Sequence, residues 1–238
     1  MASDKFTLKE ICSEFDIKTD IEAYGNGHIN DTYLCDTAPR FILQRLNTNV
    51  FKDPVSVMEN IVNVTEHLSK KITAAGGDPM RETLTVIPTK SGCSYFKADE
   101  NNYFRMYKFI EDSMSYDLVE NPIQLYHAGT AFGKFQSMLS DFSADRLHET
   151  IVDFHNTPKR VEQLNDAISN NAANRADSVR AEIDFAKEYA KYASAVIDKM
   201  NDGSVPLRVT HNDTKLNNVL FDKETGEGLC VIDLDTVM

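Results

Sequence analysis

Short β-favouring runs bounded by turn residues dominate the first hundred positions of the chain. Gly-Asn-Gly separates the first run from the second, and Thr-Ala-Pro separates the second from the third. Runs of this length and spacing predict an antiparallel meander of strands. The runs cover residues 20–24, 29–35, 40–45, 84–88 and 103–110.

A different period interrupts these strands between residues 54 and 75. Pro54 stands at the start of the segment, where proline suits the first turn of a helix. Apolar residues then recur at helical spacing, which places their side chains on one face. These residues are Val57, Ile61, Val64 and Leu68. The segment is therefore predicted to be a helix, as is a shorter one near residues 7–15.

Helical periods occupy most of the chain after about residue 112. They cover residues 122–140 and roughly 175–200. The first contains most of an apolar stripe at helical spacing, typical of a helix packed on a core, which consists of Phe132, Phe135, Leu139 and Phe142. A strand-rich lobe, residues 1–110, thus precedes a helix-rich lobe, residues 111–238. The predicted fold class is α+β.

The most informative segment lies between residues 209 and 221. It contains His-x-Asp-x-Lys-x-x-Asn, beginning at His211, and continues into an apolar run that is typical of a strand. A second apolar run, residues 229–232, ends in Asp-Leu-Asp from Asp233 onward. A polar loop before a strand, followed by a second strand that ends in an acid, is the layout of a phosphoryl-transfer site.

The chemistry of phosphoryl transfer explains the spacing. A loop aspartate accepts the proton of the attacking hydroxyl, and an asparagine five residues later holds magnesium. Asp213 and Asn218 fit these roles, and Asp233 fits the carboxylate that joins the metal to the β- and γ-phosphates. Lys215 is placed to neutralise charge on the transferred group. The alternative is a capping and turn loop, since Asp, Thr and Asn also serve there.

This loop resembles that of the aminoglycoside phosphotransferase and choline kinase superfamily, which reads His-Gly-Asp with an Asn after four further residues. Asn212 replaces the usual Gly, and Lys215 matches the protein-kinase loop instead. Further stretches are similar to N-acetylhexosamine 1-kinases. They are residues 24–33, 42–47, 213–215 and 232–236. The resemblance implies a protein-kinase-like bilobal fold, ATP and Mg²⁺ as cofactors, and a small-molecule acceptor.

The resemblance extends to the first strands. Gly25-Asn26-Gly27-His28 lies between two of them, and small residues there let backbone amides approach the phosphates closely. Hairpin turns use the same residues, so this loop alone does not define a nucleotide site. Together with the Asp213 loop it predicts one. His28 and Asn30 could also face the sugar or the phosphates, and a His satisfied within the turn is the alternative.

Protein kinases also use a cation on the third strand, a helical glutamate and a hinge. Gln44 and Arg45 stand where the cation is expected, and strand alternation lets only one of them face the cleft. Glu59 resembles the glutamate, and an exposed helical Glu is the alternative. Met106 and Tyr107 look like the hinge whose backbone binds adenine, and a core strand is the alternative.

Charge restricts the partners. The 238 residues include 25 basic and 37 acidic ones, a net charge of −12, so nucleic acids and anionic membranes are repelled. An anionic nucleotide can still bind through local backbone N–H groups and magnesium, because such contacts act at short range. A small-molecule partner remains, and the resemblance makes it an amino sugar.

Cysteine use and the terminus bear on the compartment. The four cysteines stand at no metal-ligand spacing, and the apolar surroundings of Cys230 indicate a buried thiol. The first residues lack the apolar core of a signal sequence, and no apolar run approaches the length of a membrane span. We therefore expect a reduced, cytoplasmic protein. The sequence does not define its oligomeric state.

The acceptor is the least determined part of the expected reaction. The resemblance implies the anomeric hydroxyl of an N-acetylhexosamine, and thus carbohydrate metabolism. Choline, homoserine and aminoglycosides are the alternatives, and a catalytically silent nucleotide-binding module is another, because the third-strand lysine is absent. Members of the superfamily continue beyond the position of Met238 into helices that line the acceptor pocket, so a C-terminally truncated chain with an incomplete helical lobe is expected.

Overall fold

The protein is described by a computed structural model over residues 6–25 and 29–238. Its internal contacts group the chain into two units, Met1–Ile151 with Val209–Met238, and Val152–Arg208. The first unit mixes strands and helices, and the second is helical. The boundary between two lobes at residue 110 stays a prediction, because residue 110 lies inside the first of these units and the grouping does not divide the chain there.

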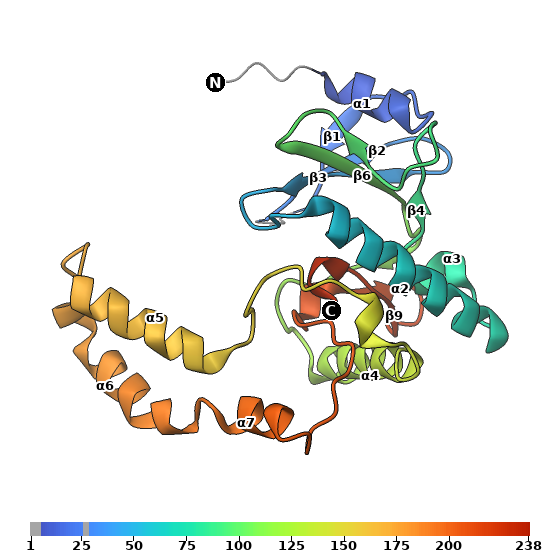
Figure 1. The fold of residues 1–238 in the computed structure, drawn as a ribbon. Coiled ribbons are helices and arrows are strands. Elements are labelled where there is room, and N and C mark those ends of the chain that lie inside the picture. The colour runs from blue at the N-terminus through green and yellow to red at the C-terminus, as the bar shows by residue number, and fades with distance from the viewer. Residues whose placement is uncertain (1–5, 26–28) are drawn as a thin grey trace. The chain divides into compact units, whose positions relative to one another are not determined.

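The N-terminal strands form the predicted antiparallel sheet, in the order β1-β2-β3-β6-β4, with β5 also paired to β6 (Figure 1). The strands are β1 (Ile21–Ala23), β2 (Asp31–Cys35), β3 (Phe41–Asn47), β4 (Val86–Ile87), β5 (Phe96–Lys97) and β6 (Asn102–Lys108). Helix α1 (Leu8–Glu14), also predicted, packs on one face of this sheet through Ile11 and Cys12. Residues 96–97 are a strand that the sequence pattern did not predict.

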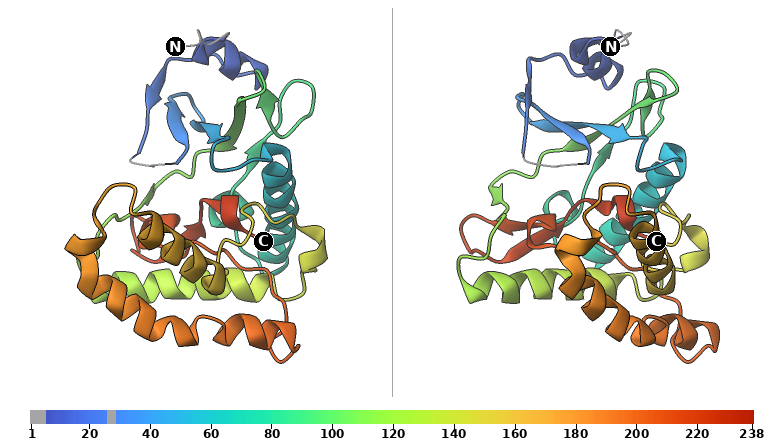
Figure 2. Two further views of the ribbon diagram at one scale, coloured as in Figure 1. Left: turned by 60° about the vertical axis from the view of Figure 1, so that its left-hand side comes forward. Right: turned by 90° about the vertical axis from the view of Figure 1, so that its left-hand side faces the viewer.

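Helix α2 (Pro54–Ala74) begins at the predicted proline. Asp53 caps it by accepting the backbone N–H of Ser56, and Pro54 occupies the first turn. The four predicted apolar residues of its stripe are all at most 2% exposed. They form one core with residues of β3, β6, α4 and the C-terminal hairpin. Helix α2 therefore lies between the N-terminal sheet and the C-terminal elements of the first unit (Figures 1 and 2).

The C-terminal elements of the first unit are a long helix and a small sheet. Helix α4 (Pro122–Met138) packs against β9, and the sheet has the order β7-β8-β9. Its strands are β7 (Ser113–Met114), β8 (Val219–Asp222) and β9 (Gly228–Val231), and the short helices of this unit are α3 (Pro79–Glu82), Ala144–Arg146, Leu216–Asn218 and Leu234–Thr236. The α+β fold class, with an antiparallel N-terminal sheet and a helical C-terminal part, is confirmed.

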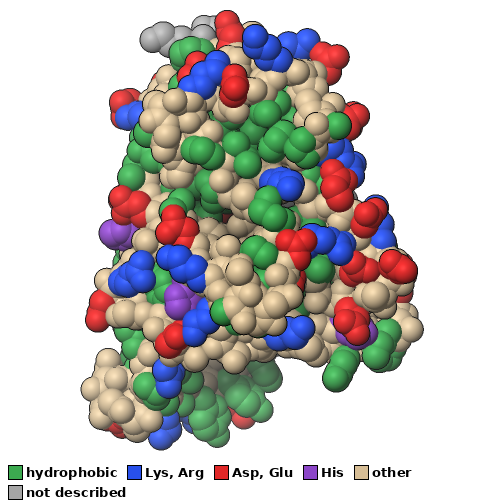
Figure 3. Space-filling model, turned by 90° about the vertical axis from the view of Figure 1, so that its right-hand side faces the viewer, with side chains coloured by type: hydrophobic (Ala, Val, Ile, Leu, Met, Phe, Trp, Pro, Cys, Tyr) green, Lys and Arg blue, Asp and Glu red, His purple; other side chains and the backbone are tan. Residues whose placement is uncertain are grey.

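The second unit consists of helices only. They are α5 (Thr157–Asn170), Ala176–Val179, α6 (Arg180–Tyr189), Ala190–Tyr192 and α7 (Ala195–Asn201). The helix predicted over residues 175–200 is thus divided by 3₁₀ turns. In the described part of the chain, no helix combines the length and the apolar character that crossing a membrane requires. Acidic and basic side chains are interspersed on the molecular face of Figure 3.

Gly228 determines how closely β9 approaches α4. A Cβ at this position would lie 2.6 Å from the backbone oxygen of His127 and 2.9 Å from the Cβ of Ala131. Backbone cannot move aside as a flexible side chain can, so we expect Gly228→Ala to lower the free energy of unfolding by about 1–3 kcal/mol.

Gly133→Ala in α4 is the matched control, since no described atom outside its own stretch of helix backbone lies within 4 Å of its Cβ position. This variant should gain up to about 1 kcal/mol from helix propensity. Urea unfolding measures both. Equal midpoints for Gly228→Ala and the unaltered chain would show that the strand and helix are not closely packed there.

Candidate active site

His211 is a buried residue that joins the predicted catalytic loop to the end of β9. It is 2% exposed, and its Nδ1 accepts the backbone N–H of Asp213 over 3.3 Å. Nε2 therefore carries the hydrogen and donates it to the carbonyl of Ile232 at 2.8 Å. Burial lowers the pKa of the imidazole, and two phenylalanine rings of α4 pack edge-on against it. His211 thus stays neutral and places Asp213 beside the residue that precedes Asp233.

Asn212 has a left-handed backbone, with a φ of 65°. Glycine adopts this conformation most easily, and asparagine tolerates it better than most residues do. This explains how Asn212 can stand where the resembling superfamily has glycine. Its Nδ2 also donates to the carbonyl of Thr236 at 2.9 Å, which glycine could not do. The asparagine therefore fastens the loop to the segment that follows Asp233.

Asp213 is held through one of its two carboxylate oxygens. Oδ2 accepts Lys215 Nζ at 2.9 Å and Asn218 Nδ2 at 3.1 Å. Asn218 Nδ2 also donates to the backbone oxygen of Asp213 at 2.8 Å. Over the described ranges Oδ1 has no partner, and the side chain is 27% exposed. The arrangement fixes the carboxylate and leaves one oxygen open to a ligand.

Asn218 and Asp233 are connected through the backbone. The carbonyl of Asn218 accepts the N–H of Ile232 at 2.9 Å, and the Asn218 side chain is 4% exposed. Asp233 has a left-handed backbone with a φ of 59°. Its half-buried carboxylate makes no hydrogen bond or ion pair with residues 6–25 or 29–238. Burial, helped by the charges of Asp235 and Asp213, raises the pKa of Asp233 to about 6.

The donor set fits a hard cation that is shared with phosphates. Asp233 offers a carboxylate that no described residue pairs with, and Asn218 offers an amide oxygen, because its Nδ2 is already directed at Asp213. Magnesium prefers oxygen ligands and in kinases takes one or two from the protein, with the remainder from phosphates and water. Within the described residues no three His, Cys, Asp or Glu side chains are close enough to hold a metal by themselves.

The third strand has Gln44, not Arg45, on the side that faces α2. Leu46, two positions along, belongs to the core around α2, and Gln44 accepts two hydrogen bonds from Arg105 on β6. Arg45 lies on the other face, where it pairs with Asp31 at 2.6 Å. Gln44 therefore lies on the face of β3 that meets α2, and which of the two residues faces the phosphates stays a prediction.

Arg105 and Asp235 are buried residues that the sequence analysis missed. Each is 1% exposed, and Arg105 Nη1 forms an ion pair with Asp235 Oδ1. Burial tends to lower the pKa of the Arg105 guanidinium, and the facing carboxylate more than reverses this effect. The Arg105 guanidinium therefore stays charged. A single Arg within a strand gives no signal that separates a buried side chain from an exposed one, and the partners are 130 positions apart in the sequence.

The other predicted nucleotide contacts that the structure describes make no side-chain hydrogen bond to Asp213, Asn218 or Asp233 within residues 6–25 and 29–238. Glu59 is about half exposed on α2 and accepts His148 Nε2 at 2.8 Å. Met106 and Tyr107 are buried in β6, which pairs with β3 on one side and β4 on the other. Gly25 has a left-handed φ of 74°, as a turn requires. The other three residues of that loop, Asn26, Gly27 and His28, lie outside the described residues.

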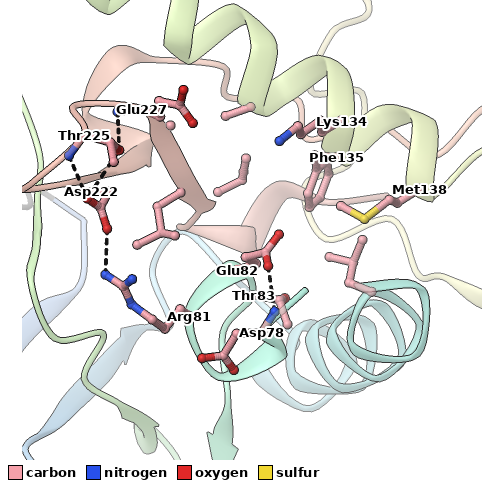
Figure 4. A pocket seen from close by; sticks show the side chains of 15 residues that line it. Asp78, Arg81, Glu82, Thr83, Lys134, Phe135, Met138, Asp222, Thr225 and Glu227 are labelled. Atoms are coloured by element: carbon pink, nitrogen blue, oxygen red, sulfur yellow. Dashed lines mark hydrogen bonds and ion pairs between the residues drawn. The ribbon is translucent and has the colours of Figure 1, made fainter. Parts of the chain in front are cut away.

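A pocket of about 280 Å³ lies elsewhere in the first unit (Figure 4). It is lined by residues of α2, α3, α4 and the β8–β9 hairpin, and within it Arg81 donates to Asp222 at 2.9 Å. Lys134 extends towards it from α4. None of the predicted site residues that the structure describes lines this pocket, which is therefore separate from the Asp213 cluster.

Comparison with known proteins gives one family match and several similar solved structures. Residues 20–238 match the model of a family described as phosphotransferase enzyme family. The chain is similar to the solved structure of APH(2'')-IIia in complex with GDP and kanamycin, with 14% identity, a TM-score of 0.58, and coverage of 95% of this chain and 71% of that one.

Two further solved structures are similar. An aminoglycoside phosphotransferase of Alicyclobacillus acidocaldarius shares 12% identity at a TM-score of 0.59, over 99% of this chain and 68% of that one. An amicoumacin kinase in complex with AMP-PNP, Ca²⁺ and its ligand shares 11% at 0.54, over 91% and 59%. At these identities the likeness shows the fold. The chain spans 59% to 71% of the length of these three structures.

Proposed function

The chain belongs to the phosphotransferase enzyme family, and we propose that it transfers the γ-phosphoryl group of ATP to a hydroxyl group of a small molecule. The observation that carries this proposal is the half-open carboxylate of Asp213, which is held through Oδ2 by Lys215 and Asn218. A base held in this way has one orientation and one free oxygen, as proton acceptance from an attacking hydroxyl requires.

Each residue of the cluster then has one task. Asp213 Oδ1 accepts the proton of the acceptor hydroxyl, and Lys215, whose Nζ lies 2.9 Å from Asp213 Oδ2, would balance charge on the transferred group. Asn218 and Asp233 would hold Mg²⁺ through oxygen atoms. When bound, the ion neutralises charge on the β- and γ-phosphates. The complex of the similar amicoumacin kinase with AMP-PNP and Ca²⁺ supports a nucleotide and a divalent cation as cofactors.

For the acceptor we propose the anomeric hydroxyl of an N-acetylhexosamine. The support is the resemblance of residues 24–33, 42–47 and 232–236 to kinases of that class. A second candidate is an aminoglycoside, because APH(2'')-IIia was solved with kanamycin. The net charge of −12 also favours a cationic acceptor over a neutral one.

An acceptor panel separates these candidates. N-acetylglucosamine, N-acetylgalactosamine, kanamycin, choline and homoserine are each incubated with the chain, ATP and Mg²⁺, and products are identified by phosphorus NMR. The expected product is a sugar 1-phosphate, whose phosphorus couples to the anomeric proton. If kanamycin were phosphorylated and no sugar phosphate formed, the acceptor would be an aminoglycoside and not an N-acetylhexosamine. Bound ATP without any phosphorylated product would favour the silent nucleotide-binding module.

A further inference from the structure

Asp235 has both carboxylate oxygens occupied within the protein. Oδ1 pairs with Arg105 Nη1, and Oδ2 accepts Asn30 Nδ2 at 2.7 Å. The side chain is 2% exposed. Although it stands two residues after Asp233, Asp235 therefore cannot bind a metal without breaking these contacts. The second acid of Asp-Leu-Asp has a different task from the first.

The contacts of Asp235 continue through the N-terminal sheet. Arg105 Nε and Nη2 donate to Gln44 Oε1 at 3.0 and 2.9 Å, and Gln44 Nε2 donates to Thr32 Oγ1 at 3.0 Å. Asn30 Oδ1 in turn accepts the backbone N–H of Asn47, at the end of β3, at 3.0 Å. The network thus begins and ends on adjacent strands and encloses the Asp235 carboxylate. We name Asn30, Gln44, Arg105 and Asp235 the clasp.

A buried ion pair is weak evidence for stability. The cost of removing two charges from water consumes most of their attraction, and apolar residues of similar volume often stabilise a fold as well or better. What such a pair supplies is a fixed geometry, because each charge accepts only a partner in the right place. In the clasp, that geometry relates three strands of the sheet to the segment that carries Asp233.

We propose that Arg105 is a positioning residue. Through its ion pair with Asp235 it holds the N-terminal sheet in a fixed position relative to the segment that carries Asp233. This inference rests on the proposed function. Arg105 supplies a fixed cation on β6 whose partner is Asp235 and not a phosphate, and Gln44 orients it. It does not touch the nucleotide, since it is 1% exposed. Its loss therefore weakens nucleotide binding through geometry rather than through a lost contact.

The test is the neutral double variant Arg105→Met/Asp235→Asn, which leaves no buried charge unpaired. Arg105→Met alone leaves the buried carboxylate of Asp235 without its cation, so this single variant should unfold at a much lower temperature than the unaltered chain. We expect the double variant to melt close to the unaltered chain. Its affinity for Mg·ATP should still fall about tenfold or more, a loss typical of mispositioned contacts. Calorimetric titration measures it.

A second readout needs no nucleotide. Amide hydrogen exchange in residues 29–33 and 232–237 should be faster in the double variant than in the unaltered chain. The matched control is Lys71→Met/Asp141→Asn, which removes an exposed ion pair between α2 and the segment after α4 and should change neither readout.

If the double variant had unchanged hydrogen exchange and unchanged Mg·ATP affinity, the proposed positioning role of Arg105 would be wrong. Failure of the unaltered chain to bind Mg·ATP would contradict the proposed function instead. In that case the exchange rates alone still decide whether the clasp holds the sheet to the Asp233 segment.

Discussion

Asp213→Asn is expected to lower kcat by about a hundredfold to ten-thousandfold, the usual contribution of a general base. The amide oxygen can still accept Lys215 and Asn218, so the loop should keep its geometry. What the amide cannot do is take the acceptor proton. The loss should therefore appear in kcat, while the affinity for Mg·ATP stays within about twofold.

Product formation by phosphorus NMR and nucleotide titration by calorimetry separate these two quantities. Asp198→Asn in α7 is the control, since this exposed carboxylate bonds only Ser194 in the described structure. Turnover by Asp213→Asn within a factor of a few of the unaltered chain would remove Asp213 from the mechanism.

Asp233→Asn is expected to stabilise the metal-free chain at neutral pH and to abolish stabilisation by Mg·ATP. A carboxyl group whose pKa is raised to about 6 in the folded state favours folding only while it is protonated. This contribution is complete below the unfolded pKa near 4 and is lost as the pH rises through 6. Above that pH the ionised group costs up to about 3 kcal/mol, which the neutral amide avoids.

Urea unfolding in EDTA at pH 7.5 and at pH 5 measures this effect. The advantage of Asp233→Asn should be largest at pH 7.5 and shrink at pH 5. Asp222→Asn should show the opposite sign, because backbone N–H groups and Arg81 lower the pKa of that carboxyl. If Asp233→Asn were less stable than the unaltered chain at pH 7.5 in EDTA, the carboxylate would have a partner that the structure does not show.

Local spacing explains what could be predicted from the sequence. Asp213, Lys215 and Asn218 lie within six residues, so one loop conformation brings them together. Asp233 was predicted from the end of an apolar strand, and hydrogen bonds of Ile232 with Asn218 and with His211 place it beside that loop. The α2 helix was predictable because proline, cap and apolar stripe all agree.

Long-range contacts explain what could not be predicted. Gln44 and Arg45 are adjacent in β3, so their side chains point to opposite faces of the sheet. Which face meets α2 depends on long-range packing, because Leu46 packs in the core around α2 and Leu43 packs in the core around α1. On α2 the sequence drew attention to Glu59, whereas the adjacent Asn60 is buried and donates to the carbonyl of Val237 at 3.0 Å. The sequence around Asn60 does not indicate this partner, because Val237 is 177 positions further along the chain.

Calorimetric titration of the chain with ATP, once with Mg²⁺ and once with excess EDTA, tests the central assignment most directly. If Asn218 and Asp233 join the metal to the phosphates, the unaltered chain binds ATP much more tightly with Mg²⁺ than without it. Asp233→Asn should bind weakly in both conditions. Equal affinities with and without Mg²⁺ for the unaltered chain, or an Asp233→Asn variant that keeps the full metal dependence, would contradict the assignment.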